Sequence, residues 1–307
     1  MIAYLLAQQI GVLFLMMAMG WLLVHFGLAR SEDSRILSVV SIYLLMPCAV
    51  IKSFQIEYTP QIRDQFLLAL TAAVAIHALL FFVTWLLGRF FHFNVEEKAS
   101  IIYSNSGNLI IPLVTAVLGP EWVIFSSAFL CVQLFFIFTQ CQSMMQGQPV
   151  FNIRRLLSNV NLIAIAIGLA LFLTGIRLPR IPYDVVNGVS ACLGPVCMLL
   201  LGIIMASVNW RETLRRKRLY LVTFLKMIVV PGVVLAFLKY SGLSHLVPDG
   251  QTILLISLLA VTTPSATTIV QFCQLYDKDA GYASSINALT TIVSILTMPL
   301  LVWMYLI

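Results

Sequence analysis

Long apolar segments recur along the whole chain, and this repetition constrains the fold more than any other feature. Of the 307 residues, 61% are hydrophobic and 10% are charged, whereas soluble domains carry about 25% charged residues. A helix needs about 20 mostly apolar residues to cross a bilayer. Ten such segments predict an all-α polytopic membrane protein with ten transmembrane helices. They cover approximately residues 2–28, 36–55, 65–88, 97–118, 121–145, 158–176, 184–208, 217–240, 250–273 and 280–306.

The basic residues lie mostly in the loops on one side of these spans. The loops after spans 1, 3, 5, 7 and 9 hold twelve Lys and Arg residues, and the other loops hold five. Because cytoplasmic loops carry an excess of Lys and Arg, both termini are predicted to lie outside a plasma or inner membrane. The net charge of +6 comes largely from one loop and is interpreted as a cytoplasmic anchor rather than a nucleic-acid site. That loop contains Arg211, Arg215, Arg216, Lys217 and Arg218.

Two of the spans are interrupted by polar residues and proline. Residues 104–112 interrupt the fourth span, and residues 262–268 interrupt the ninth. Proline removes a backbone donor, and bare backbone groups are tolerated at membrane depth only where they face protein or a water-filled cavity. We therefore predict that these spans are broken at Pro112 and Pro264. Two interrupted segments at matching places in two halves point to a transporter's substrate site.

The two halves resemble inverted repeats. Pro112 and Pro264 are 152 residues apart, and Gln133 and Asn287 are 154 apart. A unit of five spans is odd, so a duplicated copy must insert in the opposite orientation. The sequence predicts a first repeat over 1–146, a cytoplasmic linker over 147–157 and an inverted second repeat over 158–307.

The polar residues around the breaks are the candidate substrate-binding residues. Asparagine amides can donate to a carboxylate. Pro264 suits the first position of a half-helix, with Thr263 as its cap. The free amides and the dipole at the start of such a half-helix favour an anion. Ordinary helix packing is the alternative, and Gln133 and Asn287 either line a cavity or bridge helices. The full set is Asn105, Gly107, Asn108, Pro112, Thr263, Pro264, Ser265, Thr267, Gln133 and Asn287.

Two ionisable residues fall in mid-span, at His77 and Lys226. Such residues are costly in a bilayer and are usually functional. His77 is a candidate for proton coupling or substrate binding, or it is a neutral ring bonded to a backbone carbonyl. Lys226 is a candidate charge partner, or its ammonium reaches the nearby interface. Lys52 is interpreted as an interface anchor.

The sequence provides no set of residues for catalysis or for a resident metal. The six cysteines form no CxxC or metal-type cluster, and HExxH and GxSxG motifs and paired carboxylates are absent. No cofactor is therefore expected, and an intramembrane enzyme is disfavoured. All acidic residues fall in loops or at span ends, so a sodium site would have to use carbonyls, amides and hydroxyls.

The chain resembles the auxin efflux carrier (AEC) family, which includes plant auxin exporters and bacterial carriers described as malate permeases. The resemblance spans essentially the whole chain and rests on Ser104–Leu113, Thr263–Thr267, Ala283–Ser285 and Thr297–Leu300. It implies fourth and ninth helices that cross near the membrane centre. It also implies a scaffold of helices 1, 2, 6 and 7, a moving unit of helices 3–5 and 8–10, and elevator-type alternation.

The chain departs from the plant proteins in two places. Its central loop has about a dozen residues, and His77 is the one ionisable residue in the middle of the third span. Both departures favour a small carboxylate, malate-like or auxin-like, over auxin itself. The predicted function is secondary transport of a small organic anion, with a proton or sodium as coupling ion and a homodimer left open. The alternative is a membrane sensor that binds the substrate without moving it.

Overall fold

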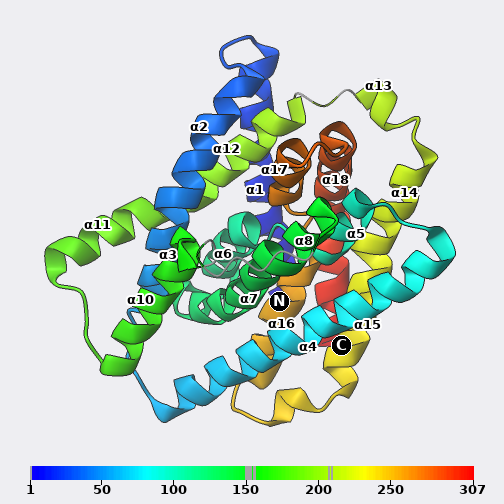
Figure 1. Cartoon of the computed structure of the whole chain (residues 1–307). Coiled ribbons are helices and arrows are strands. Elements are labelled where there is room, and N and C mark those ends of the chain that lie inside the picture. The colour runs from blue at the N-terminus through cyan, green and yellow to red at the C-terminus, as the bar shows by residue number, and fades with distance from the viewer. Residues whose placement is uncertain (1, 149–153, 155–156, 207, 209) are drawn as a thin grey trace.

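The chain is helical throughout the part that the structure describes. The computed structural model describes residues 2–148, 154, 157–206, 208 and 210–307. Figure 1 shows helices packed around the centre of the molecule. Over the described residues the β-structure consists of one isolated antiparallel bridge, between Ser104 and Ser265. The prediction of an all-α chain is confirmed. Much of the predicted linker 147–157 lies outside the described residues.

Six helical segments in the described residues are long and apolar enough to cross a membrane, which supports a multi-pass membrane protein. Three of them contain a π-turn, and one contains a junction at Cys192. The segments are α2, η2 and α3 (Ser34–Val40, Ser41–Leu45, Met46–Ser53); α4 (Pro60–Phe91); η3, α7, η4 and α8 (Pro120–Trp122, Val123–Phe136, Ile137–Cys141, Gln142–Gln146); α11 and α12 (Arg180–Ala191, Leu193–Ala206); α14, η5 and α15 (Lys217–Phe224, Leu225–Val229, Val230–Tyr240); and α18 (Ala280–Leu306).

The remaining helices are shorter, or only part of their length is apolar. The apolar ones are α1 (Ile2–His25, apolar over Gly11–His25), α6 (Ser106–Val117), α10 (Val160–Thr174) and α16 (Gly250–Thr262). Short helices α5 (Val95–Ile102), α13 (Trp210–Thr213) and α17 (Thr267–Leu275) and the 3-10 turns η1 (Ser31–Asp33) and η6 (Leu243–His245) complete the described chain.

The fourth predicted span is interrupted, but not at its proline. α5 ends at Ile102 and α6 begins at Ser106, whereas Pro112 lies inside α6. The prediction that Pro112 breaks this span is therefore wrong. A proline can remain in a membrane helix where neighbouring groups compensate for the lost donor, and here Pro112 packs against Gly194 of α12. In the ninth span, Pro264 does lie between α16 and α17.

Two glycines allow α1 and α12 to touch backbone to backbone. A Cβ added at Gly20 of α1 would lie 2.3 Å from the Leu199 carbonyl oxygen, and one added at Gly202 of α12 would lie 1.9 Å from the Met17 carbonyl oxygen. Small residues are common at such contacts because lipid provides no hydrophobic force between membrane helices, so close packing must hold them together.

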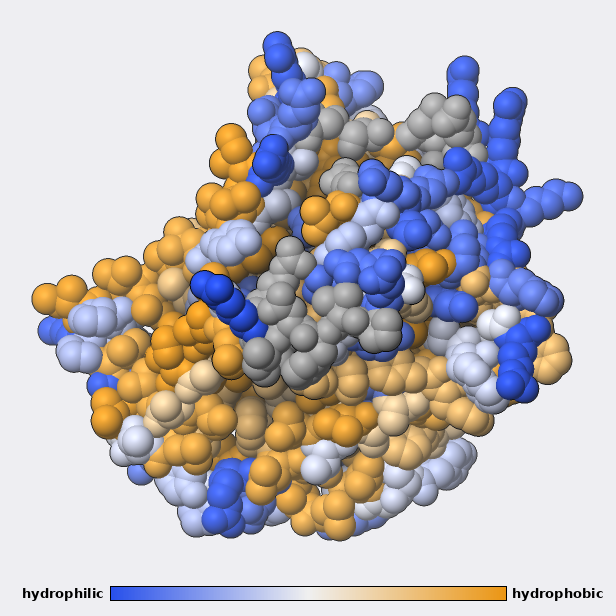
Figure 2. Space-filling model, viewed as in Figure 1, coloured by the Kyte–Doolittle hydropathy of each residue, from blue (hydrophilic) through white to orange (hydrophobic). Residues whose placement is uncertain are grey.

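An ion cluster joins α4, α5, α14 and α18 at one end of the molecule. The Arg218 guanidinium donates to both carboxylate oxygens of the fully buried Glu97 and to the carbonyls of Phe91 and His92. The Tyr282 hydroxyl also donates to Glu97, at 2.9 Å. Figure 2 shows hydrophilic side chains gathered around α13 and α14 at this end, next to an apolar band.

Asp279 extends the ion cluster at the start of α18. Its carboxylate accepts from Arg216 at 3.0 Å and from the Tyr282 N–H at 2.8 Å. Although partial burial acts in the opposite direction, these hydrogen bonds lower the pKa of Asp279. The negative carboxylate is thereby favoured at the N-terminus of α18.

Replacing Gly20 with alanine should destabilise the protein, because the new methyl group collides with the α12 backbone. We expect a cost of about 1–3 kcal/mol, the usual range for overpacking, measured as a lower unfolding temperature in detergent. Gly11→Ala is the matched control on the same helix, since nothing lies within 4 Å of its added Cβ. Equal unfolding temperatures for the two variants would contradict the close contact.

Candidate functional site

The two helix breaks meet and pair through their backbones. The Asn105 N–H donates to the Pro264 carbonyl at 2.7 Å, and the Ala266 N–H donates to the Tyr103 carbonyl at 3.0 Å. These bonds flank the bridge between Ser104 and Ser265. Each unwound segment therefore satisfies polar backbone groups of the other, as an irregular segment in the protein interior requires.

A polar side chain from the next span holds each break. Gln133 of α7 donates from Nε2 to the Ser104 carbonyl at 2.9 Å and to the Ser106 hydroxyl at 2.8 Å. Its Oε1 accepts from the Ser104 N–H at 3.3 Å. At the other break, Asn287 of α18 donates from Nδ2 to the Ser265 carbonyl. Of the two interpretations of Gln133 and Asn287, the structure shows the one in which they bridge helices.

Thr290 also binds the second break. Its hydroxyl oxygen accepts from the Ser265 N–H at 3.2 Å, three residues after Asn287 on the same helix. Thr290 was not among the predicted residues, because a threonine in an apolar helix has no distinctive signal. The i, i+3 spacing from Asn287 places both side chains on one face of α18 and is the clue that could have found it.

Lys226 reaches the first break from the π-turn η5. Its side chain is fully buried, and Nζ donates to the Ser104 hydroxyl at 2.6 Å and to the Ile101 carbonyl at 3.2 Å. Of the two interpretations, the one in which this ammonium reaches the interface is wrong, because its partners lie inside the protein. Ile101 is in the last turn of α5, where the helix dipole favours a cation.

His77 lies apart from the breaks in an aromatic pocket. Its Nδ1 lies 2.8 Å from the Ala73 carbonyl, the geometry of a ring that donates from Nδ1. The ring centroid lies 5.0 Å from that of Phe129 and 5.4 Å from that of Phe136. Nε2 is buried without a hydrogen-bond partner among the described residues. The structure thus shows the contact expected for a neutral, carbonyl-bonded histidine.

Two buried polar atoms at the crossing have no partner in the described chain. They are Nδ2 of Asn105, one residue after the bridge, and the hydroxyl oxygen of Ser265 in the bridge itself. Both side chains are at most 5% exposed. A buried amide or hydroxyl without a partner carries a desolvation cost, which a bound ligand or water at this position would remove.

The other predicted residues have different surroundings. Asn108 accepts a hydrogen bond at 3.6 Å from the Cys197 thiol of α12. Gly107 allows α6 to approach Met46, since a Cβ added at Gly107 would lie 2.6 Å from Cε of Met46. Thr263 donates back to the Ala260 carbonyl at 2.8 Å, and α17 begins only at Thr267. The prediction that Thr263 caps a half-helix starting at Pro264 is therefore wrong, because the segment after Pro264 is extended and pairs with the first break.

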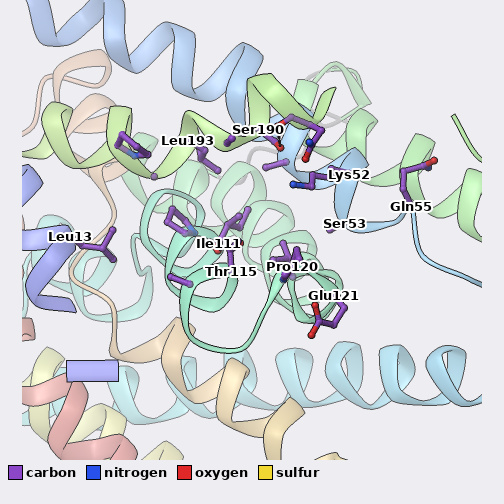
Figure 3. Close-up of a pocket in the computed structure, with 18 of the residues that line it drawn as sticks. Leu13, Lys52, Ser53, Gln55, Ile111, Thr115, Pro120, Glu121, Ser190 and Leu193 are labelled. Atoms are coloured by element: carbon purple, nitrogen blue, oxygen red, sulfur yellow. Dashed lines mark hydrogen bonds between the residues drawn. The ribbon is translucent and has the colours of Figure 1, made fainter. Parts of the chain in front are cut away.

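A cavity of about 670 Å³ lies beside α6, between it and α1, α3, α11 and α12 (Figure 3). Of the twelve predicted residues, only Pro112 lines it. Lys52, interpreted from the sequence as an interface anchor, lies in its wall. The lining also includes Leu13, Met16, Ser53, Gln55, Ile111, Thr115, Glu121, Val123, Asn187, Ser190, Leu193 and Gly194. The described residues contain no group of three His, Cys, Asp or Glu side chains that could hold a metal ion.

Replacing Gln133 with leucine should destabilise the crossing. The change leaves the buried N–H and C=O of Ser104 without these partners, at a cost of about 1–3 kcal/mol. Thermal unfolding of the purified protein measures the loss. Gln251→Leu is the control, because Gln251 is exposed at the start of α16. An unchanged unfolding temperature in Gln133→Leu would show that the glutamine does not hold the break.

Two comparisons with known proteins bear on the family of this chain. A protein-family model described as "Membrane transport protein" matches residues 6–302, a range that includes both breaks and the side chains that hold them. A comparison with curated proteins found no match. Because the family match covers nearly the whole chain, this protein belongs to the membrane transport protein family, the family of the auxin efflux carriers.

Proposed function

We propose that the protein is a secondary active transporter that moves a small organic anion across the membrane. The observation that carries this proposal is the crossing of the two unwound segments, where the Asn105 amide and the Ser265 hydroxyl are buried without a partner in the described chain. Interrupted helices that meet inside a membrane protein are typical of transporter substrate sites. Of the residues predicted from the sequence, Gln133 and Asn287 bind the two segments at this point.

The half-helices favour an anion. Both α6 and α17 begin two residues after the bridge, at Ser106 and Thr267. The N-terminus of a helix carries free N–H groups and a partial positive charge, which stabilise a carboxylate. The Asn105 amide adds a donor at the same place. A malate-like or auxin-like carboxylate fits this set of groups.

The arrangement of the cavity supports an elevator-type mechanism. We assign ten spans to two inverted repeats over 1–146 and 158–307, with helices 1, 2, 6 and 7 as scaffold and 3–5 and 8–10 as the moving unit. The cavity lies between scaffold elements α1, α3, α11 and α12 and the moving helix α6. Pro112 is in contact with Gly194 across this boundary. Movement of α6 along the scaffold would carry a substrate held at the crossing.

The cavity opens toward the outer face in this proposal. Its lining includes Gln55 and Ile56, which follow α3, and Pro120 and Glu121, which follow α6. These residues lie at the loops with few Lys and Arg residues, which we assign to the outside of a plasma or inner membrane. Both termini then lie outside.

For the coupling ion we propose a proton carried by Lys226 rather than by His77. Lys226 contacts the break directly, whereas His77 faces phenylalanine rings. The Lys226 ammonium also occupies the hydroxyl and carbonyl oxygens of Ser104 and Ile101, which are the kind of ligands that a sodium ion would need. Loss of the lysine proton would free these oxygens and change the interactions that hold the crossing.

Replacing Asn105 with alanine should reduce transport without unfolding the protein. The side-chain donor of Asn105 makes no hydrogen bond to the described chain, so its loss should cost little stability but remove a substrate contact. We expect uptake of labelled carboxylates into proteoliposomes to fall by about tenfold or more, the effect of one lost hydrogen bond to a charged group. Asn161→Ala is the matched control, because Asn161 is also buried with an unpartnered atom but lies in α10. Equal uptake by the two variants would contradict the site.

Flux separates this function from its alternative. A sensor would bind the carboxylate and be stabilised by it, but sealed proteoliposomes containing the wild-type protein would accumulate no label. Uptake that exceeds that of empty liposomes supports transport. Binding without uptake, under an imposed gradient of protons or of sodium, would instead favour the sensor.

Lys226→Met should remove the dependence of uptake on a proton gradient. In the wild type, we expect uptake to change when the outside pH is lowered and not when sodium replaces potassium. In His77→Gln, the pH dependence should persist, since His77 does not touch the break. Loss of the pH dependence in His77→Gln and its retention in Lys226→Met would contradict this assignment of the proton carrier.

A further inference from the structure

Lys52 carries an ammonium that no side chain in the described chain balances. It lies in the last turn of α3, is half-buried and points into the cavity (Figure 3). The ion pairs of the described residues do not include it. An interface anchor places its charge among headgroups, whereas this charge lies in a hollow between helices.

The one acidic residue of the cavity wall, Glu121, is directed away from Lys52. The Glu121 carboxylate folds back over its own turn, since its Oε1 is 2.5 Å from the position that a Cβ of Gly119 would occupy. Figure 3 shows the Glu121 side chain at the opposite edge of the cavity, directed away from Lys52. Lys52 is therefore the one cationic residue of this cavity wall, and the one carboxylate lies at its opposite edge.

The serine and threonine hydroxyls of the wall already donate within their own helices. Ser53 donates to the Val50 carbonyl at 2.7 Å, Thr115 to the Ile111 carbonyl at 2.8 Å and Ser190 to the Asn187 carbonyl at 2.8 Å. The uncharged amides of Gln55 and Asn187 and the hydroxyl group of Tyr183 are other polar groups that line the cavity. A ligand can thus find one cationic partner here.

The rest of the wall is apolar. Leu13, Met16, Ile111, Val123, Leu193 and Pro112 face the hollow. A second carboxylate placed against such a surface would lose its hydration without gaining a cation, and an unpaired charge in an apolar environment is costly. An apolar ligand body would instead gain free energy through burial.

We infer that Lys52 selects the substrate: its ammonium binds the carboxylate of a small monocarboxylate, and the apolar wall holds the remainder. This inference rests on the proposed transport of organic anions and narrows their class to monocarboxylates with an apolar body. Lys52 acts at the entrance cavity, before the substrate reaches the crossing of the breaks.

Ligands of equal length test the inference in the purified full-length protein. Hexanoate, hexanedioate and hexanamide share a six-carbon chain and carry one, two and no carboxylates. By thermal shift and isothermal titration, wild-type protein should bind hexanoate at least about tenfold more tightly than either of the others. Lys52→Met should lose this preference, and Lys52→Arg should retain it.

Lys239→Met is the matched control, because Lys239 is exposed at the end of α15 and lines no cavity described here. A second readout needs no variant: hexanoate should protect Lys52, and not Lys239, from an amine-acylating reagent in the wild type, as followed by mass spectrometry. Protection of both lysines or of neither would overturn the inference, even if Lys52→Met fails to fold.

The outcomes distinguish this inference from the proposed function. If the wild type transports carboxylates but binds hexanedioate as well as hexanoate, or if folded Lys52→Met binds hexanoate normally, Lys52 is not the selecting group and transport stands. If the wild type neither binds nor transports any organic anion, the proposed function fails, and the role of Lys52 fails with it.

Discussion

The need to satisfy backbone polar groups away from water controls the centre of this molecule. A helix satisfies its own N–H and C=O groups, but the segments around Ser104 and Ser265 are not helical. In hydrocarbon such groups cost several kcal/mol each. The two segments therefore bind one another, and Gln133, Asn287 and Thr290 bind what the crossing leaves open. Lys226 also binds at this pairing, through the Ser104 hydroxyl.

The buried charges of Glu97 and Lys226 have different kinds of partner. Glu97 lies in an ion cluster with Arg218 and Tyr282, where several donors compensate its burial. Lys226 lies at the break without a carboxylate partner among the described residues, and its ammonium is held by a hydroxyl and by a carbonyl at the end of α5. A buried charge that has only dipoles as partners is sensitive to the binding of a ligand and to the loss or gain of a proton. The first arrangement fastens four helices together, and the second suits a group that changes state.

In the proposed function, the cavity and the crossing bind the substrate at two different places. The cavity combines apolar walls with the single cation of Lys52, whereas the crossing combines helix N-termini with an amide and a hydroxyl. Only Pro112 among the predicted residues belongs to the cavity. In the proposed function, the cationic cavity attracts and sorts ligands, and the crossing of polar groups holds them. The two regions meet on α6, which supports its assignment as a moving helix.

The sequence by itself determined the all-α membrane fold, the family and the position of the two breaks along the chain, because hydropathy and clustered polar residues are local signals. It also identified Gln133, Asn287 and Lys226, since polar side chains in apolar spans are conspicuous. Tertiary structure decided the rest. Pro112 remained helical, where it packs against Gly194 of α12. Thr263 did not cap a half-helix starting at Pro264, because the segment after Pro264 pairs with the first break. Thr290 and Lys52 acquired their places only when distant helices packed together, and no local pattern encodes which helix faces which.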